Sequence, residues 1–137
     1  MKERYVLEAL QKAVIAAAPG SLPVKYVGRS LDVPSDDKYL EVVHLPNNVE
    51  NQYWGDSKTY RGLMRLILHW PIDDAGAYPM MDIAKTVADN FSKGSLFQDL
   101  GANVTVKISE NPNITSIIEQ PPEMLLPISI RYIYFDA

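Results

Sequence analysis

The chain of 137 residues contains no cysteine. Disulfide bonds, thiolate zinc sites and cysteine nucleophiles are therefore excluded. Long apolar runs are also missing, because no stretch approaches the roughly 18 residues that a membrane-spanning helix needs. The N-terminal residues form an amphipathic segment rather than the apolar core of a secretory signal. We therefore expect a soluble, cytosolic chain that does not bind membranes.

The chain also lacks a strong charge of either sign. Its formal net charge is −4, with acidic and basic residues mixed along the sequence. This balance argues against a protein whose main task is to neutralise nucleic acid or to coat an anionic membrane. Apolar residues make up 47% of the chain and charged residues 22%, which is ordinary for globular proteins. We expect a single domain, residues 1–137, with a substantial core.

Residues that carry catalysis are few. The two histidines, His44 and His69, lie in predicted strands with no carboxylate or serine at a suggestive spacing. The glycines form neither of the common phosphate-binding patterns. Aspartate pairs stand at 36–37 and 73–74, but a closed oxygen-ligand site needs more ligands at ordered spacing, and the second pair precedes a predicted helix, whose N-terminus favours negative charge. We therefore expect no catalytic residues, no cofactor and no metal site.

The longest predicted strand covers residues 58–71. Read with a period of two, one of its faces is apolar, with Met64, Leu66 and Leu68, and must be buried. Gly62, on the same face, indicates a bulge or a close backbone approach. The opposite face alternates cations with aliphatic side chains: Thr59, Arg61, Leu63, Arg65, Ile67 and His69. Helices on one side of this strand and a partner subunit on the other would explain both faces.

Two helices are predicted. The first covers residues 2–18, with an apolar stripe formed by Leu7, Leu10, Val14 and Ala17. Pro19 and Gly20 follow and should end it. The second begins at residue 75 or 79 and runs to residue 92, and its stripe contains Met80, Ile83 or Ala84, Val87 and Phe91.

Further strands are predicted over residues 23–27, 38–45, 102–108, 114–119 and 126–135. Pro46 should end the second of these strands. Residues 49–57 should form an exposed loop, whose length suggests a functional role. The order of elements predicts an α+β two-layer sandwich, with an antiparallel or mixed sheet of about four to six strands and two helices packed on one face.

Three arginines are candidate contact residues. Arg61 and Arg65 share one face of the central strand, and Arg131 lies in the last strand among aliphatic residues. These side chains could extend from an ordinary solvated sheet face. Alternatively they form a subunit or tube interface, because arginine and aromatic residues are enriched at interfaces. Tyr53 and Trp54, in the predicted loop, fit the second interpretation.

Several segments together carry a resemblance that covers nearly the whole chain. They are Ala17-Ala-Pro-Gly20, Tyr39-Leu-Glu-Val-Val-His-Leu-Pro46, Tyr60-Arg-Gly-Leu-Met-Arg-Leu-Ile-Leu68, Asn90-Phe-Ser-Lys-Gly94 and Pro127-Ile-Ser-Ile-Arg-Tyr-Ile-Tyr134. The chain resembles the tail terminator, or tail completion, proteins of long-tailed bacteriophages. The resemblance rests on patterns of small and apolar residues and carries no catalytic signature.

The resemblance implies a structural role in the virion, after assembly in the bacterial cytoplasm. Proteins of this kind form a ring, commonly of about six subunits, in which each subunit uses two different patches. The ring sits on the head-proximal end of the tail tube, stops polymerisation of the tube protein and presents a surface to the head connector. DNA passing through the lumen is compatible with the acidic balance, and no sequence-specific nucleic-acid binding is expected.

Two other interpretations stay open. One is a different neck or head–tail joining protein of similar size. The other is a small α+β ligand-binding domain or enzyme that uses the loop around Tyr53, Trp54 and Asp56. A well-formed apolar pocket with converging polar groups would favour the latter.

Overall fold

The computed structural model describes residues 3–18, 22–28, 38–50, 58–72, 76–99 and 104–136. In chain order its elements are α1 (Glu3–Ala17), β1 (Val24–Lys25), β2 (Tyr39–Glu50), β3 (Lys58–Pro71), α2 (Tyr78–Asp89), β4 (Leu96–Asp99), β5 (Val104–Ile108), β6 (Asn113–Ile114), β7 (Ile118–Gln120) and β8 (Glu123–Asp136). The strands form one sheet in the order β1-β2-β3-β8-β5-β4, and β6 and β7 also pair with β8. Only the β1–β2 pair is parallel among these pairings, so the sheet is mixed. The predicted α+β class is confirmed, with more strands than expected.

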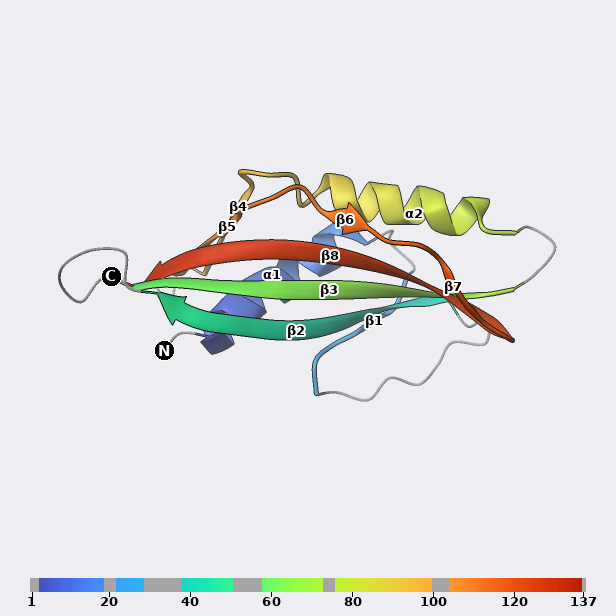
Figure 1. The fold of residues 1–137 in the computed structure, drawn as a ribbon, viewed down its shortest axis with the longest axis horizontal. Helices are drawn as coiled ribbons and strands as arrows, with labels where there is room; N and C mark the ends of the chain where they lie inside the picture. The colour runs from blue at the N-terminus through green and yellow to red at the C-terminus, as the bar shows by residue number, and fades with distance from the viewer. Residues whose placement is uncertain are drawn as a thin grey trace.

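Strand β3 lies at the centre of the sheet (Figure 1). It has the predicted bounds, residues 58–71, and pairs with β2 on one side. On its other side it pairs with β8 along its whole length. Strong apolar alternation over 14 residues makes such a strand identifiable from the sequence alone.

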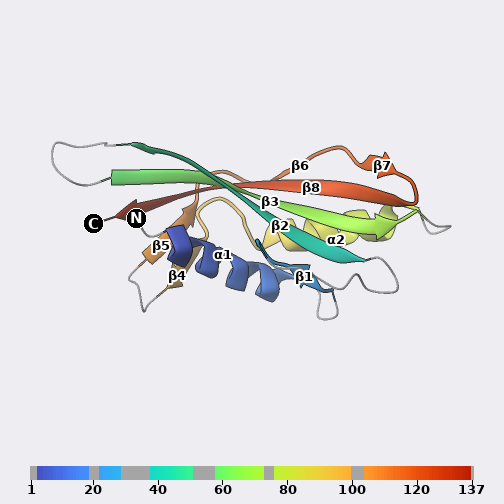
Figure 2. The same cartoon turned by 90° about the horizontal axis from the view of Figure 1, so that it is seen from below.

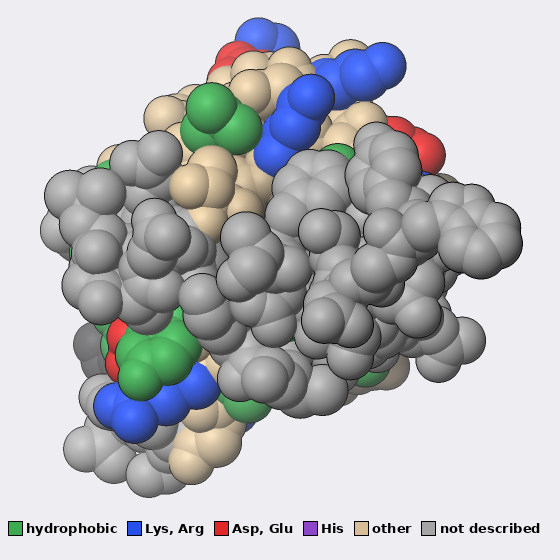
Figure 3. Space-filling model, turned by 90° about the vertical axis from the view of Figure 1, so that its left-hand side faces the viewer, with side chains coloured by type: hydrophobic (Ala, Val, Ile, Leu, Met, Phe, Trp, Pro, Cys, Tyr) green, Lys and Arg blue, Asp and Glu red, His purple; other side chains and the backbone are tan. Residues whose placement is uncertain are grey.

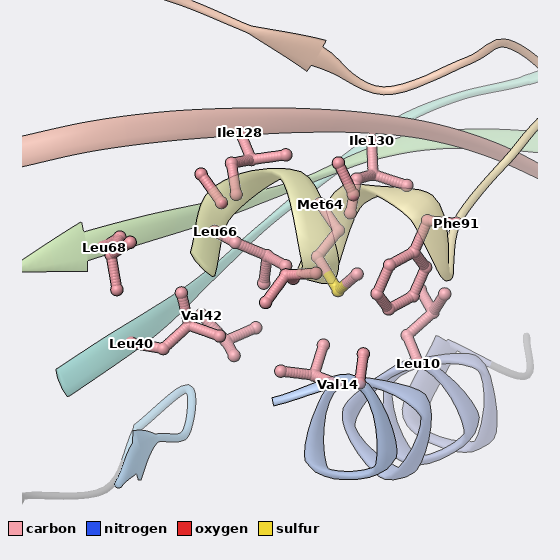
Figure 4. Close-up of a cluster of buried hydrophobic side chains, with 14 of the residues drawn as sticks. Leu10, Val14, Leu40, Val42, Met64, Leu66, Leu68, Phe91, Ile128 and Ile130 are labelled. Atoms are coloured by element: carbon pink, nitrogen blue, oxygen red, sulfur yellow. The ribbon is translucent and has the colours of Figure 1, made fainter. Parts of the chain in front are cut away.

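Both helices lie on the same face of the twisted sheet (Figure 2). The inward side chains of β2, β3 and β8 meet those of the helices in one core (Figure 4). On α1, Val6, Leu10 and Val14 are fully buried, whereas Leu7 is only half-buried. The buried stripe of α1 therefore begins at Val6 and not at Leu7 as expected. Burial of each large apolar side chain contributes about 1.5–3 kcal/mol.

Helix α2 begins at Tyr78, with Pro79 in its first turn. Proline is tolerated there because the first turn has no intrahelical acceptor for its missing N–H. The helix ends at Asp89 rather than at residue 92. The Asn90 side chain donates to the Thr86 carbonyl at 2.9 Å, and Phe91 turns into the core.

The prediction that Pro46 ends β2 was wrong, because the strand continues to Glu50. The N–H of Leu40 donates to the Pro23 carbonyl, on the side away from β3. Alternate residues of a strand face the same way, so the nitrogen of Pro46 also points away from β3 and breaks no bond of that ladder. The register shifts only between Pro46 and Val49.

The single strand predicted for residues 114–119 is replaced by β6 and β7, which both pair with β8. Between them, Ile117 packs against the core. The sequence analysis missed β4, which pairs with β5. These strands have two to four residues, too few to show a period.

Candidate interaction surface

The face of the sheet opposite the helices carries a mixture of aliphatic and cationic side chains. We call it the open sheet face and define it by the outward residues of β2, β3 and β8: Val43, Leu45, Arg61, Leu63, Arg65, Ile67, Pro127, Ser129, Arg131 and Ile133. The register pairs Leu63 with Arg131 and Arg65 with Ser129. Arg131 therefore lies diagonally between Arg61 and Arg65, so the three predicted arginines share one face.

The aliphatic residues of the open sheet face are neither core nor fully exposed. Leu63, Ile67 and Ile133 are half-buried, and Leu45 is 44% exposed. Their burial comes from neighbouring side chains on the sheet, since both helices lie on the other side (Figure 2). Covering them with a protein surface would remove further apolar area from water.

Arg65 lies at the middle of this face and is half-buried. Its Nε atom is buried and finds no hydrogen-bond acceptor in the part of the chain that the structure describes. A buried donor without an acceptor costs about 1–3 kcal/mol. A carboxylate brought to Arg65 would therefore supply the acceptor that its Nε atom lacks.

Arg131 and Arg61 are both exposed. Arg131 Nε lies 3.7 Å from Glu110 Oε2, and both side chains are well exposed. An exposed pair of this kind contributes little to stability. Tyr53 and Trp54, the two remaining predicted contact residues, lie outside the described residues.

Basic side chains are also prominent at one end of the molecule, where β2 ends, β3 begins and β8 ends. Figure 3 views this end, where Lys and Arg side chains stand out more than Asp and Glu on the visible, described surface.

His69 lies at the opposite end of β3 and is only 7% exposed. Its Nε2 atom is 3.0 Å from Glu41 Oε1, its Nδ1 atom is 3.5 Å from Glu123 Oε2, and its ring stacks on Tyr39. The imidazole thus connects β2, β3 and β8. The sequence analysis missed these partners, because they face His69 only once the strand register is known.

Gly62 allows a second link across the strands. The phenol of Tyr132, on β8, lies over Gly62 and hydrogen-bonds with His44 Nε2 on β2. A Cβ atom at position 62 would lie 2.8 Å from Tyr132 Cε1 and closer still to its hydroxyl. The predicted close approach at Gly62 is confirmed, and both histidines have structural contacts.

A groove that the sequence analysis missed lies between α2 and the segment that follows β6. We call it the α2 groove; its volume is about 780 Å³ and its lining residues are Met81, Asp82, Lys85, Ile114, Thr115, Ser116, Ile117 and Leu126. Met81 is 49% exposed and Ile114 42% exposed, so apolar surface continues onto the rim. Figure 1 shows β6 beside α2 at this edge of the sheet.

The described ranges contain neither a cluster of metal ligands nor a helix that could span a membrane. No group of three or more His, Asp or Glu side chains there is arranged to hold a metal ion. Neither α1 nor α2 has the length and apolar character required to cross a membrane.

The fold is a two-layer α+β sandwich, in which one mixed sheet is covered by two helices on one face and carries aliphatic and arginine side chains on the other. The family model described as phage tail terminator protein matches residues 5–132, and the chain belongs to this family. A solved structure 20% identical to this chain superposes with a TM-score of 0.75, covering 96% of this chain and 92% of the other. At this identity the likeness establishes the fold alone. A search of curated proteins finds no match.

Family membership identifies the chain as a structural protein related to the phage tail and as a component of the virion. It implies contacts with other tail or head proteins.

Proposed function

We propose that the chain assembles into a ring of about six copies on the head-proximal end of the tail tube. In this position it stops polymerisation of the tube protein and presents a surface to the head connector. The observation that carries the proposal is the family match over residues 5–132.

The open sheet face supports a role in protein contact. It combines half-buried aliphatic side chains with three arginines, and arginine is enriched at interfaces. The acceptor missing at Arg65 Nε would be supplied by a partner surface. Arg61, Arg65 and Arg131 are therefore the proposed contact residues, together with Tyr53 and Trp54.

Native mass spectrometry over a protein concentration series, with negative-stain imaging of the same samples, tests ring formation. Polymerisation of the tube protein from the same phage should then be followed with and without this chain. We expect closed rings of about six copies, free or on tube ends, and tubes that stop growing when the chain is added.

The alternative neck-protein role gives a different result in the same assay. A neck or head–tail joining protein would bind the connector or the finished tail and leave tube growth unchanged. Unchanged growth, with no particles on tube ends, would contradict the terminator function.

A further inference from the structure

We propose that the open sheet face of one copy docks against the α2 groove of the next copy, with Arg65 facing Asp82. This inference rests on the proposed function, because it specifies how neighbouring copies in the ring meet. A head-to-tail ring requires two different patches on every copy, and each patch must complement the other. Helix α2, which supplies Met81, Asp82 and Lys85 to the α2 groove, lies on the face of the sheet opposite the open sheet face (Figure 2).

The charges of the two surfaces are complementary. The open sheet face presents Arg61, Arg65 and Arg131. On the wall of the α2 groove, the exposed carboxylate of Asp82 has no ion-pair partner in the described part of the chain, whereas the nearby Lys85 pairs with Asp89 at 3.3 Å. A carboxylate brought against a half-buried guanidinium forms a charge-assisted hydrogen bond.

The apolar parts of the two surfaces also match. The side chains of Leu63, Ile67 and Ile133 are partly exposed to solvent on the open sheet face. Met81 and Ile114 do the same at the α2 groove, above a floor that includes Leu126. Each surface therefore combines an aliphatic patch with charged side chains, and the carboxylate of Asp82 is opposite in sign to the guanidinium of Arg65. A docked pair would bury both patches and supply the acceptor that Arg65 Nε lacks.

Disulfide trapping tests this contact. The chain contains no cysteine, so only the introduced thiols can form disulfides. Ser129→Cys places a thiol beside Arg65, and Met81→Cys places one in the α2 groove. Under mild oxidation, the double variant should give a ladder of covalent dimers and larger species on a non-reducing gel. Each single variant should remain monomeric on the gel, because neither position meets its own copy in a head-to-tail contact.

Ser129→Cys combined with Lys12→Cys is the matched control, because Lys12 is an exposed residue of α1 outside the α2 groove. Samples should be oxidised at protein concentrations at which native mass spectrometry detects assembly. If the chain assembles only on tube ends, tubes should be present during oxidation. Rings without a ladder would overturn this inference and leave the proposed function standing. Cross-linking of either single variant would also overturn it, since the contact would then be two-fold.

A charge exchange provides an independent measurement. Asp82→Arg should weaken self-association by at least about tenfold. Combination with Arg65→Glu should recover most of that loss, because the two charges are exchanged across the same contact. No recovery in the double variant, with both proteins folded, would contradict the Arg65–Asp82 pairing. If no variant and no wild-type sample assembles on tubes, the proposed function itself fails.

Discussion

Proline is tolerated inside two long strands because of the direction in which its nitrogen points. Pro46 lies on the outer edge of β2. The carbonyl of Pro127 accepts a bond from the Thr115 N–H, so this residue also turns its polar groups away from β3. The sequence analysis placed Pro127 inside a strand but took Pro46 as the end of one, and the second prediction failed because the missing donor of Pro46 faces away from β3.

Gly62→Ala tests the contact between the backbone of β3 and Tyr132. The added methyl group would overlap the phenol ring, and the ring is buried. We expect the free energy of unfolding to fall by about 1–3 kcal/mol in denaturant titration. Thr105→Ala, at an exposed strand position, is the control and should change it little. Wild-type stability in Gly62→Ala would show that Tyr132 can move aside at no cost.

Leu66→Asp tests the assignment of the two faces of β3. Leu66 is fully buried, so the substitution places a carboxylate in the core. We expect a loss of about 3–5 kcal/mol in the free energy of unfolding. Ile67→Asp, at the adjacent half-buried position on the open sheet face, should cost clearly less. Equal losses in the two variants would contradict the assignment.

At the scale of elements, the sequence predicts whatever repeats often enough to show a period. The 14 residues of β3 and the two helices were identified for this reason. In contrast, β4, β6 and β7 are defined by the neighbour that each pairs with. Their formation depends on contacts between distant segments, which local propensity does not encode.

The candidate interaction surfaces were also predicted only in part from the sequence. Alternation placed Arg61 and Arg65 on one face of β3 and Arg131 on one face of β8, because a period of two fixes which side of its strand each residue takes. That these two faces coincide is known only from the register of β3 with β8. The α2 groove could not be predicted, since it forms where Met81 and Ile114 come together across separate elements. The contacts of His69 likewise depend on register.

His69→Leu tests the link among β2, β3 and β8. The substitution leaves Glu41 and Glu123 without the imidazole, although Glu41 keeps its contact with Lys25 at 3.5 Å. We expect the free energy of unfolding to fall by about 1–3 kcal/mol. In a Glu41→Leu background the same substitution should cost less, because the partner is already absent. Equal costs in the two backgrounds would show that the contact between His69 and Glu41 adds nothing to stability.

At the scale of the whole molecule, Arg65→Glu should separate folding from assembly. The side chain lies on the face opposite the helices, so the core is untouched. We expect the thermal unfolding transition to remain and self-association to weaken by about tenfold or more, measured by analytical ultracentrifugation. Lys12→Glu on α1 is the control. Unchanged assembly with an intact transition would remove Arg65 from the interface.

The pairing of β3 with β8 also has a kinetic consequence. It joins residues far apart in the sequence, with Lys58 opposite Asp136. Folds dominated by such distant pairings fold slowly, because a long loop must close before the pairing stabilises it. During that interval β3 has an unpaired edge and uncovered apolar faces, which other chains can bind. Refolding should therefore be slow, and its yield should fall as protein concentration rises.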